Sequence, residues 1–214
     1  MKSKGIVGLV LSVAMMAMVG CCTAGSNADV GTDLKPVIYL YPQEENTEIS
    51  VRLDYNGDIT ELIPEFNSEN TWTVTANPDG QITFEGQQYD YLFWEGVPKY
   101  EYDFFTGYCV KGSETEGFLR DKLSEQGLNE VEINEFLRFW LPDMEGNPYN
   151  IISFQDRTYR KGAQLTVTPQ PDTMIRVFMA WYPSDVSVKI NPQILDSPSR
   201  QGFTVVEWGG NRVY

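Results

Sequence analysis

The sequence feature that most constrains the fold is a stretch of helical periodicity, Ser113–Leu141, inside a chain whose other apolar residues mostly alternate as in strands. Ser113 and Glu116 have the spacing of a capping box, which predicts that a first helix begins at Ser113. Gly127 is suited to the left-handed conformation that ends many helices. A first helix is therefore predicted between Ser113 and Gly127.

A second helix is predicted directly after this glycine. Asn129 and Glu132 repeat the capping-box spacing, and Pro142 is predicted to end the helix. The apolar residues between them recur at helical spacing, at Ile133, Phe136, Leu137, Trp140 and Leu141. The two helices thus form a pair, each with one apolar side that has to pack on the rest of the protein.

Two β-hairpins are predicted in the first half of the chain. Alternation over 49–55 and again over 59–63, with Asn56-Gly57-Asp58 between them, predicts a hairpin with a three-residue loop. The second hairpin joins 72–76 to 82–84 through a type I turn, in which Gly80 takes the left-handed position. That register places Ala76 opposite Ile82.

The second half of the chain predicts a central strand. Residues 175–182 are largely apolar on both alternating faces, so this strand should be covered on both sides, on one side by the helical pair. Residues 186–190 alternate and are predicted to form another strand. We therefore expect an α+β fold: a mainly antiparallel β-sheet or sandwich with a two-helix insertion packed on it, the helical pair spanning 113–141.

The first twenty residues have the pattern of a bacterial lipoprotein signal peptide. Lys2 and Lys4 precede an apolar segment, 6–19, which is too short to span a bilayer comfortably. It leads into Ala17-Met18-Val19-Gly20-Cys21, which resembles a lipobox, with Met18 a less usual residue at its first position. The alternatives are an ordinary signal peptide cut nearby and an uncleaved membrane anchor.

This pattern divides the chain into three parts: a signal peptide at 1–20, a lipidated Cys21 with a flexible tether at 21–34, and a single β-rich domain at 35–214. Acyl chains such as palmitate on Cys21 would hold the protein to a membrane. The predicted location is therefore the extracytoplasmic face of a bacterial cell envelope.

Composition excludes several classes of function. Removing Lys2 and Lys4 leaves 14 basic and 30 acidic side chains, a net charge of −16, which repels nucleic acid. The chain contains no histidine, which excludes a Ser–His catalytic triad and a His-ligated zinc site. No metal or cofactor is expected. Cys109 lies between Tyr108 and Val110 and is interpreted as a structural thiol.

The stretch 89–108 is unusually rich in aromatic residues with carboxylates between them. Such side chains can stack on sugar rings and bind their hydroxyls. The residues proposed to bind a ligand are Trp94, Tyr100, Tyr102 and, from the C-terminal strand, Trp208. The alternative is a pair of twisted strands whose aromatic residues face the core.

Two similar phrases suggest a possible catalytic pair. Trp94-Glu95-Gly96 and Glu207-Trp208-Gly209 each place a tryptophan beside a carboxylate and a glycine. If the two strands were neighbours, Glu95 and Glu207 could converge, and two carboxylates are the minimum for glycoside hydrolysis. Burial of both tryptophans would count against this reading. The alternative is two strand ends with solvated carboxylates and core tryptophans.

Three phrases carry a resemblance to a known family: PVIYLYP at 36–42, YLFWEG at 91–96 and GFTVVEWGG at 202–210. The sequence resembles a family of uncharacterised bacterial secreted or lipid-anchored proteins over nearly the whole of residues 35–210. This resemblance implies an extracytoplasmic setting. The family has no assigned activity, so no catalytic residue carries over.

We therefore expect a lipid-anchored envelope protein that acts as a binding or interaction module for a glycan or a protein. The rival interpretation is a carboxylate-dependent hydrolase such as a glycosidase. A third is a structural spacer in a larger envelope complex.

Overall fold

The structure is a computed structural model that describes residues 31–213, and it confirms a β-dominated α+β fold. The predicted signal peptide, Cys21 and most of the predicted tether lie outside the described residues. The strands are β1 (Leu34–Tyr41), β2 (Thr47–Tyr55), β3 (Gly57–Ile63), β4 (Thr71–Ala76), β5 (Ile82–Phe84), β6 (Gln87–Tyr89), β7 (Leu92–Pro98), β8 (Tyr108–Lys111), β9 (Tyr149–Phe154), β10 (Ala163–Thr168), β11 (Thr173–Ser184) and β12 (Thr204–Arg212). The helices are α1 (Thr115–Glu125), α2 (Glu130–Met144) and α3 (Arg157–Gly162).

The strands form two sheets. One has seven strands in the order β3-β7-β1-β12-β11-β9-β8, and the other has five in the order β10-β2-β4-β5-β6. Strands β11 and β12 run parallel, and the other strand pairs are antiparallel. The predicted central strand is β11, which lies between β12 and β9 and is buried along most of its length. None of the helices in the described part of the chain is long and apolar enough to span a membrane.

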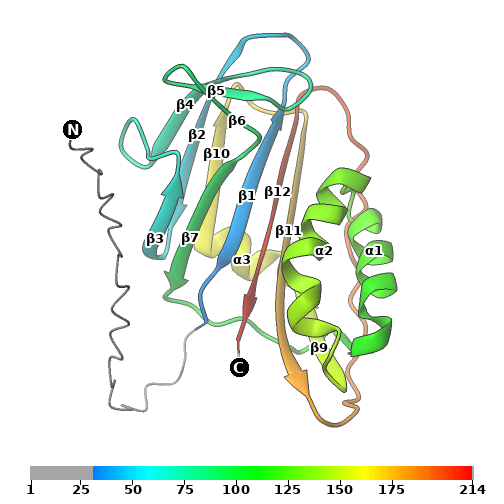
Figure 1. The fold of residues 1–214 in the computed structure, drawn as a ribbon. Coiled ribbons are helices and arrows are strands. Elements are labelled where there is room, and N and C mark those ends of the chain that lie inside the picture. The colour runs from blue at the N-terminus through cyan, green and yellow to red at the C-terminus, as the bar shows by residue number, and fades with distance from the viewer. Residues whose placement is uncertain (1–30, 214) are drawn as a thin grey trace, which may run out of the picture.

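The seven-stranded sheet is packed on both faces, so the described residues form three layers (Figure 1). Alternation along β12 assigns its side chains to the two sides. Val205 belongs to the core between the sheets, whereas Val206 and Trp208 belong to the core under α1 and α2. Gly210 lets α2 approach closely, because a Cβ there would lie 2.7 Å from Trp140 Cζ2.

The helical pair is confirmed, with two corrections at its ends. Ser113 does not cap α1: it lies in a 3₁₀ turn, Gly112–Glu114, and the Glu114 N-cap makes no side-chain capping bond. Gly127 does take the predicted left-handed conformation, with a φ of +92°. Helix α2 continues through Pro142 to Met144, so the prediction that this proline ends the helix was wrong.

Of the two predicted hairpins, the second is confirmed and the first is wrong. Ala76 pairs with Ile82 across the 77–80 turn, and Gly80 has a φ of +91°. By contrast, β2 belongs to the five-stranded sheet and β3 to the seven-stranded sheet, so the chain changes sheets at Asn56. The backbone groups of Asn56 bond to Gly162 and Lys99 of neighbouring segments. Alternation defines the face of a strand, but it does not define the partner.

Two further boundaries differ from the sequence-based expectation. Residues 186–190 form no strand, and Val186 is 66% exposed. The tether was predicted to reach Leu34, but Asp33 is buried and pairs with Gly96, and Leu34 begins β1. These last two residues therefore belong to the sheet.

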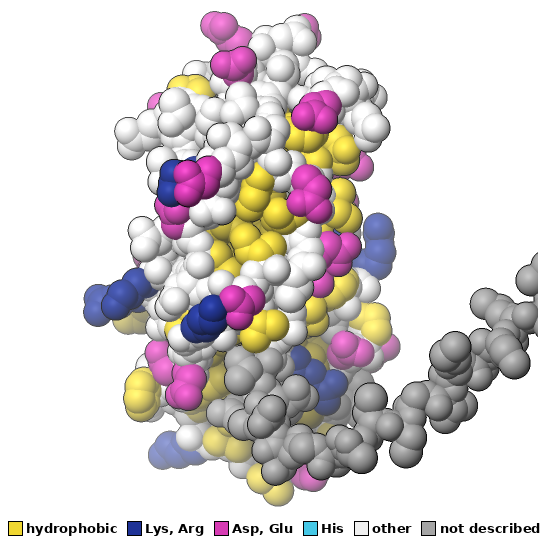
Figure 2. Space-filling model, turned by 90° about the vertical axis from the view of Figure 1, so that its left-hand side faces the viewer, with side chains coloured by type: hydrophobic (Ala, Val, Ile, Leu, Met, Phe, Trp, Pro, Cys, Tyr) yellow, Lys and Arg dark blue, Asp and Glu magenta, His cyan; other side chains and the backbone are white. Residues whose placement is uncertain are grey.

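The helices leave part of the seven-stranded sheet uncovered. In Figure 1, α1 and α2 lie over its right-hand strands, while β3 and β7 lie to the left of them. Figure 2 views the molecule from the side of β3 and shows hydrophobic side chains near the middle of this side, with acidic side chains next to them. Ile63, at the end of β3, is 46% exposed.

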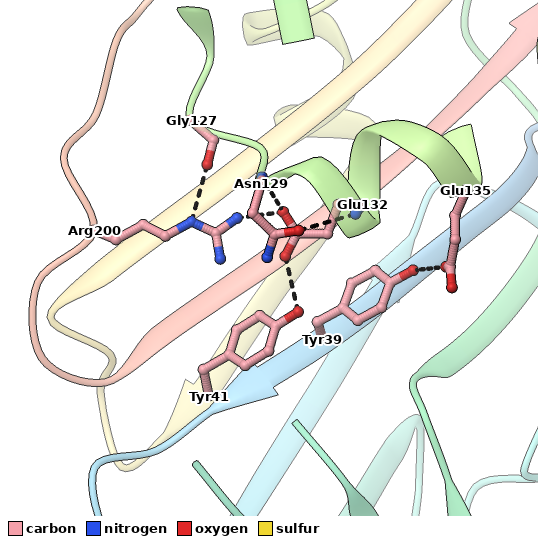
Figure 3. A network of polar contacts seen from close by, with 7 residues as sticks. All are labelled: Tyr39, Tyr41, Gly127, Asn129, Glu132, Glu135 and Arg200. Atoms are coloured by element: carbon pink, nitrogen blue, oxygen red, sulfur yellow. Dashed lines mark hydrogen bonds and ion pairs between the residues drawn. The ribbon is translucent and has the colours of Figure 1, made fainter. Parts of the chain in front are cut away.

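A polar network fixes α2 to β1 and to the long connection between β11 and β12 (Figure 3). Asn129 and Glu132 form the predicted capping box, with reciprocal bonds of 2.8 and 3.0 Å. The fully buried Glu132 carboxylate also accepts a 2.8 Å bond from the Tyr41 hydroxyl and pairs with Arg200. Arg200 in turn donates to the carbonyl of Gly127. One carboxylate thus joins a helix start, a strand and a connection.

Glu132→Ala is expected to lower the free energy of unfolding by about 3 kcal/mol, because it leaves Tyr41, Arg200 and a helix start without their shared partner. The matched control is Glu130→Ala in the same helical turn, where the carboxylate is 82% exposed and a loss below about 1 kcal/mol is expected. Urea unfolding measures both values. Equal losses in the two variants would contradict the assigned role of Glu132.

Candidate functional site

The two tryptophans predicted to bind a ligand are fully buried, on opposite faces of the seven-stranded sheet. Trp94 lies in the core between the sheets, where its Nε1 donates to Glu207 at 3.4 Å. Trp208 lies under α2, with its ring centre 5.4 Å from that of Phe136. Both indoles are thus buried and present no face to solvent, and the Trp208 ring contacts Lys35, whose Nζ lies 5.9 Å from the ring centre.

The predicted catalytic pair does not converge. Glu207 pairs across the sheet with Ile38 and faces the core between the sheets, where it forms a 2.6 Å ion pair with the buried Arg176. Glu95 lies on the opposite face, since it follows Phe93 by two residues on β7 and Trp94 between them faces inward. The sheet separates the two carboxylates, so the convergence required by the hydrolase interpretation was wrong.

Tyr100 and Tyr102 turn their hydroxyls toward the buried Asp33. The Tyr102 hydroxyl donates to Asp33 Oδ1 at 2.6 Å, and the Tyr100 hydroxyl donates to Oδ2 at 3.1 Å. Tyr55 and Asn211 complete the set, at 2.8 and 2.9 Å. Tyr100 and Tyr102 thus hold the beginning of β1 in place. Their hydroxyl groups, which a ligand would have needed, are bonded to Asp33.

The pKa of the Asp33 carboxyl group is raised above its ordinary value. Burial raises its pKa, and the four hydrogen bonds, of which that from Tyr102 is the strongest, only partly oppose this effect. Burial also raises the pKa of Tyr55, Tyr100 and Tyr102, with the Asp33 charge as the next cause. The three phenols therefore stay protonated and act as donors.

The best-formed candidate site lies on the uncovered face over β7. Tyr91, Phe93 and Glu95 point to this face, because they alternate with the inward-facing Leu92 and Trp94. Two hollows of about 610 and 270 Å³ lie there, and both are lined by Lys35 and Tyr91. We call this surface the β7 groove; it is lined by Lys35, Glu61, Ile63, Gln81, Gln88, Tyr89, Asp90, Tyr91, Phe93, Glu135, Arg138 and Phe139.

Lys35 is the central residue of the β7 groove. It lies at an irregularity in the pairing of β1 with β12 and has a φ of +52°, a left-handed conformation that is uncommon for a residue with a side chain. Its backbone N–H donates to Glu95 Oε1 at 3.2 Å. Burial raises the pKa of Glu95, while this backbone bond works in the opposite direction. Glu95 is thus a positioning residue for Lys35.

The groove has the chemistry of a binding surface. It combines aromatic faces with amides, carboxylates and one ammonium, and such groups can contact both the apolar faces and the hydroxyls of a polar ligand. Within residues 31–213 no cluster of three or more cysteine, aspartate and glutamate side chains could hold a metal ion.

A second cleft, of about 450 Å³, lies where β9 ends beside β11. Residues 173–178 of β11 have no strand partner on the β9 side, and the loop 193–198 faces this edge. Gln193 fills part of this gap, since its side-chain amide makes two bonds to the backbone of Phe154 at 2.7 and 2.8 Å. This cleft is polar and lacks the row of aromatic side chains that marks the β7 groove.

The predicted ligand-binding residues and the lining of the β7 groove come from the same segment but differ. The prediction named Trp94, whereas Tyr91, Phe93 and Lys35 line the groove. The alternation along 91–95 could have shown that Phe93 and Trp94 face opposite sides, because successive residues of a strand point to opposite faces. Phe139 had no signal in the sequence, since it reaches the groove only through the packing of α2.

The fold and this groove define a β-rich α+β protein with two packed sheets and a surface groove. The chain is 67% identical over 96 residues to a protein of Butyrivibrio fibrisolvens described as an uncharacterized protein in the bglA 3′ region. The match covers 45% of this chain and 99% of that protein, so the chain belongs to the same bacterial family. No family model and no solved structure matches the chain.

The Asp33 cluster predicts a pH-dependent effect of Asp33→Asn. Because the folded-state pKa of Asp33 is raised above its ordinary value, protonation in the folded protein adds stability as the pH falls through that raised pKa. The asparagine variant cannot gain this stability. The unfolding free energy of wild type minus that of the variant should therefore increase as the pH falls from 7, as measured by urea unfolding at several pH values.

Asp121→Asn on the exposed side of α1 is the matched control, and its difference from wild type should not grow in this way. A difference for Asp33→Asn that stays constant or shrinks as the pH falls would contradict the assignment.

Proposed function

We propose that this protein is a lipid-anchored, extracytoplasmic binding module whose ligand site is the β7 groove. The observation that carries the proposal is the row of aromatic side chains Tyr89, Tyr91 and Phe93, at the end of β6 and the start of β7, beside a part of the sheet that the helices leave uncovered (Figure 1). A sheet face lined with partly exposed aromatic residues is costly to leave in water unless a ligand covers it.

A glycan is the ligand that suits the groove best. Tyr89, Tyr91 and Phe93 offer ring faces, while Gln81 and Gln88 offer amide donors and acceptors for sugar hydroxyls. The hollow of about 610 Å³ is within the usual size of a ligand site. A protein ligand is the alternative, and the same variants test both.

The membrane anchor is supported by the sequence around Cys21. The groove includes Lys35, which follows the predicted tether within the first residues of β1. An anchor there would keep the groove within a few nanometres of the membrane surface.

Phe93→Ala is expected to weaken binding of a groove ligand about tenfold or more, because it removes a central ring face. Binding would be measured on a glycan array and then by calorimetry for each hit. Phe105→Ala is the matched control, since Phe105 is 87% exposed and lies outside the groove. A ligand whose affinity falls with Phe105→Ala and not with Phe93→Ala would place the site elsewhere.

Cys21→Ser is expected to move the protein from the membrane fraction to the soluble fraction, because the serine cannot carry the acyl chains. Cys22→Ser is the control and should leave the protein with the membrane. Fractionation followed by mass spectrometry of the N-terminal peptide gives the result. An unmodified Cys21 with Met1–Gly20 still attached would contradict the anchor.

A further inference from the structure

The Lys35 ammonium lies among four aromatic rings. Its Nζ is 5.2 Å from the ring centre of Tyr91, 5.6 Å from Phe139, 5.8 Å from Phe93 and 5.9 Å from Trp208. These rings come from the start of β7 and the residue just before it, from α2 and from β12, so the fold assembles them from three separate parts of the chain. Aromatic rings around one cation form the kind of cage that recognises quaternary ammonium groups.

The rings, rather than a carboxylate, hold this charge. Within residues 31–213 no aspartate or glutamate forms an ion pair with Lys35, although acidic side chains outnumber basic ones in the chain. The Lys35 Nζ makes a long hydrogen bond of 3.4 Å to the Tyr91 hydroxyl. The ammonium is therefore bound weakly and by ring faces, which a different cation could contact equally well.

The backbone directs Lys35 into the cage. The left-handed φ of +52° occurs at the irregularity in β1, and Glu95 holds the backbone N–H there. Irregularities of this kind redirect side chains at functional sites, and a strained backbone persists only where surrounding contacts fix it. The backbone can remain in place while the long side chain rotates out of the cage.

The surroundings favour cations. Besides Lys35, the two hollows beside the cage carry three carboxylates, from Glu61, Asp90 and Glu135, and one guanidinium, from Arg138. The chain without its predicted signal has a net charge of −16, which raises the local concentration of cations. A quaternary ammonium group is also weakly hydrated, so it loses less hydration in the cage than the lysine ammonium does.

We propose that this cage binds the quaternary ammonium group of a ligand and that Lys35 is a displaceable internal occupant that competes for it. The proposal rests on the β7 groove being the ligand site and adds the chemical class of one group of the ligand. Movement of the Lys35 side chain is the only change needed to open the cage to a ligand in the groove.

The test is a titration of the purified protein, as wild type and as Lys35→Ala, with choline. Lys35→Ala should bind choline about tenfold or more tightly than wild type, because the internal competitor is gone. The neutral isostere 3,3-dimethyl-1-butanol should not show this gain. Adding Phe139→Ala to Lys35→Ala should weaken choline binding again.

Equal choline affinity in wild type and Lys35→Ala, or equal binding of the neutral isostere, would overturn the proposal. A second measurement needs no variant: the NMR signals of the Lys35 ε-methylene protons in wild type should lie upfield from ring currents and move downfield when choline is added. Signals that do not move at saturating choline would likewise overturn it.

Vesicles of phosphatidylcholine provide a second source of the same headgroup. Binding of free choline supports the cage, and additional binding of the vesicles that Phe139→Ala weakens assigns a lipid headgroup as the source. If the glycan array yields a ligand that depends on Phe93 while choline does not bind, the cage proposal fails and the groove proposal stands.

Discussion

The structure depends on a seven-stranded sheet whose central strands are apolar on both faces and must be covered on both. Strands β11 and β12 carry core residues on each side, including Ile175 and Val177 under the helices and Phe178 between the sheets. Neighbouring strands lie about 4.8 Å apart, so seven strands span roughly 29 Å, whereas two packed helices cover about 20 Å. The helical pair is therefore too narrow for the sheet, and the uncovered strands β3 and β7 form the floor of the groove.

The buried charges are placed where they fix the pairing of strands. Arg176 and Glu207 face each other across the parallel β11–β12 pair, and the Trp94 indole of β7 bonds to the same carboxylate. A shift of β12 by one residue would move Glu207 to the helix side and leave the buried Arg176 unpaired, which costs several kcal/mol. The ion pair thus specifies register more than it adds stability. The carboxylate beside the tryptophan in the sequence is thus buried and ion-paired inside the sheet packing.

Features that depend on residues close together in the sequence could be predicted, and features that depend on long-range packing could not. Capping at Asn129 and the turn at 77–80 depend on residues within a few positions, and both were correct. The partner of β2 depends on long-range packing, and its prediction failed because alternation over 49–63 suits a hairpin as well as two strands in different sheets. The burial of Trp94 has the same cause. Local alternation shows that β7 has two different faces, but the packing of the second sheet determines that the Trp94 face is the buried one.

Lys35 lies where the N-terminal end of the described domain meets the groove. Asp33, two residues earlier, is fixed by four hydrogen bonds and by backbone pairing with Gly96, so tension on the preceding chain is resisted there before it reaches β1. The residue after Lys35 is Pro36, whose ring restricts φ within the same irregularity of β1. With both neighbours rigid, the Lys35 side chain is the part that is free to move. A ligand that enters the cage therefore has to exchange one cation for another at a fixed set of rings, which is a competition between two charges and requires no rearrangement of the sheet.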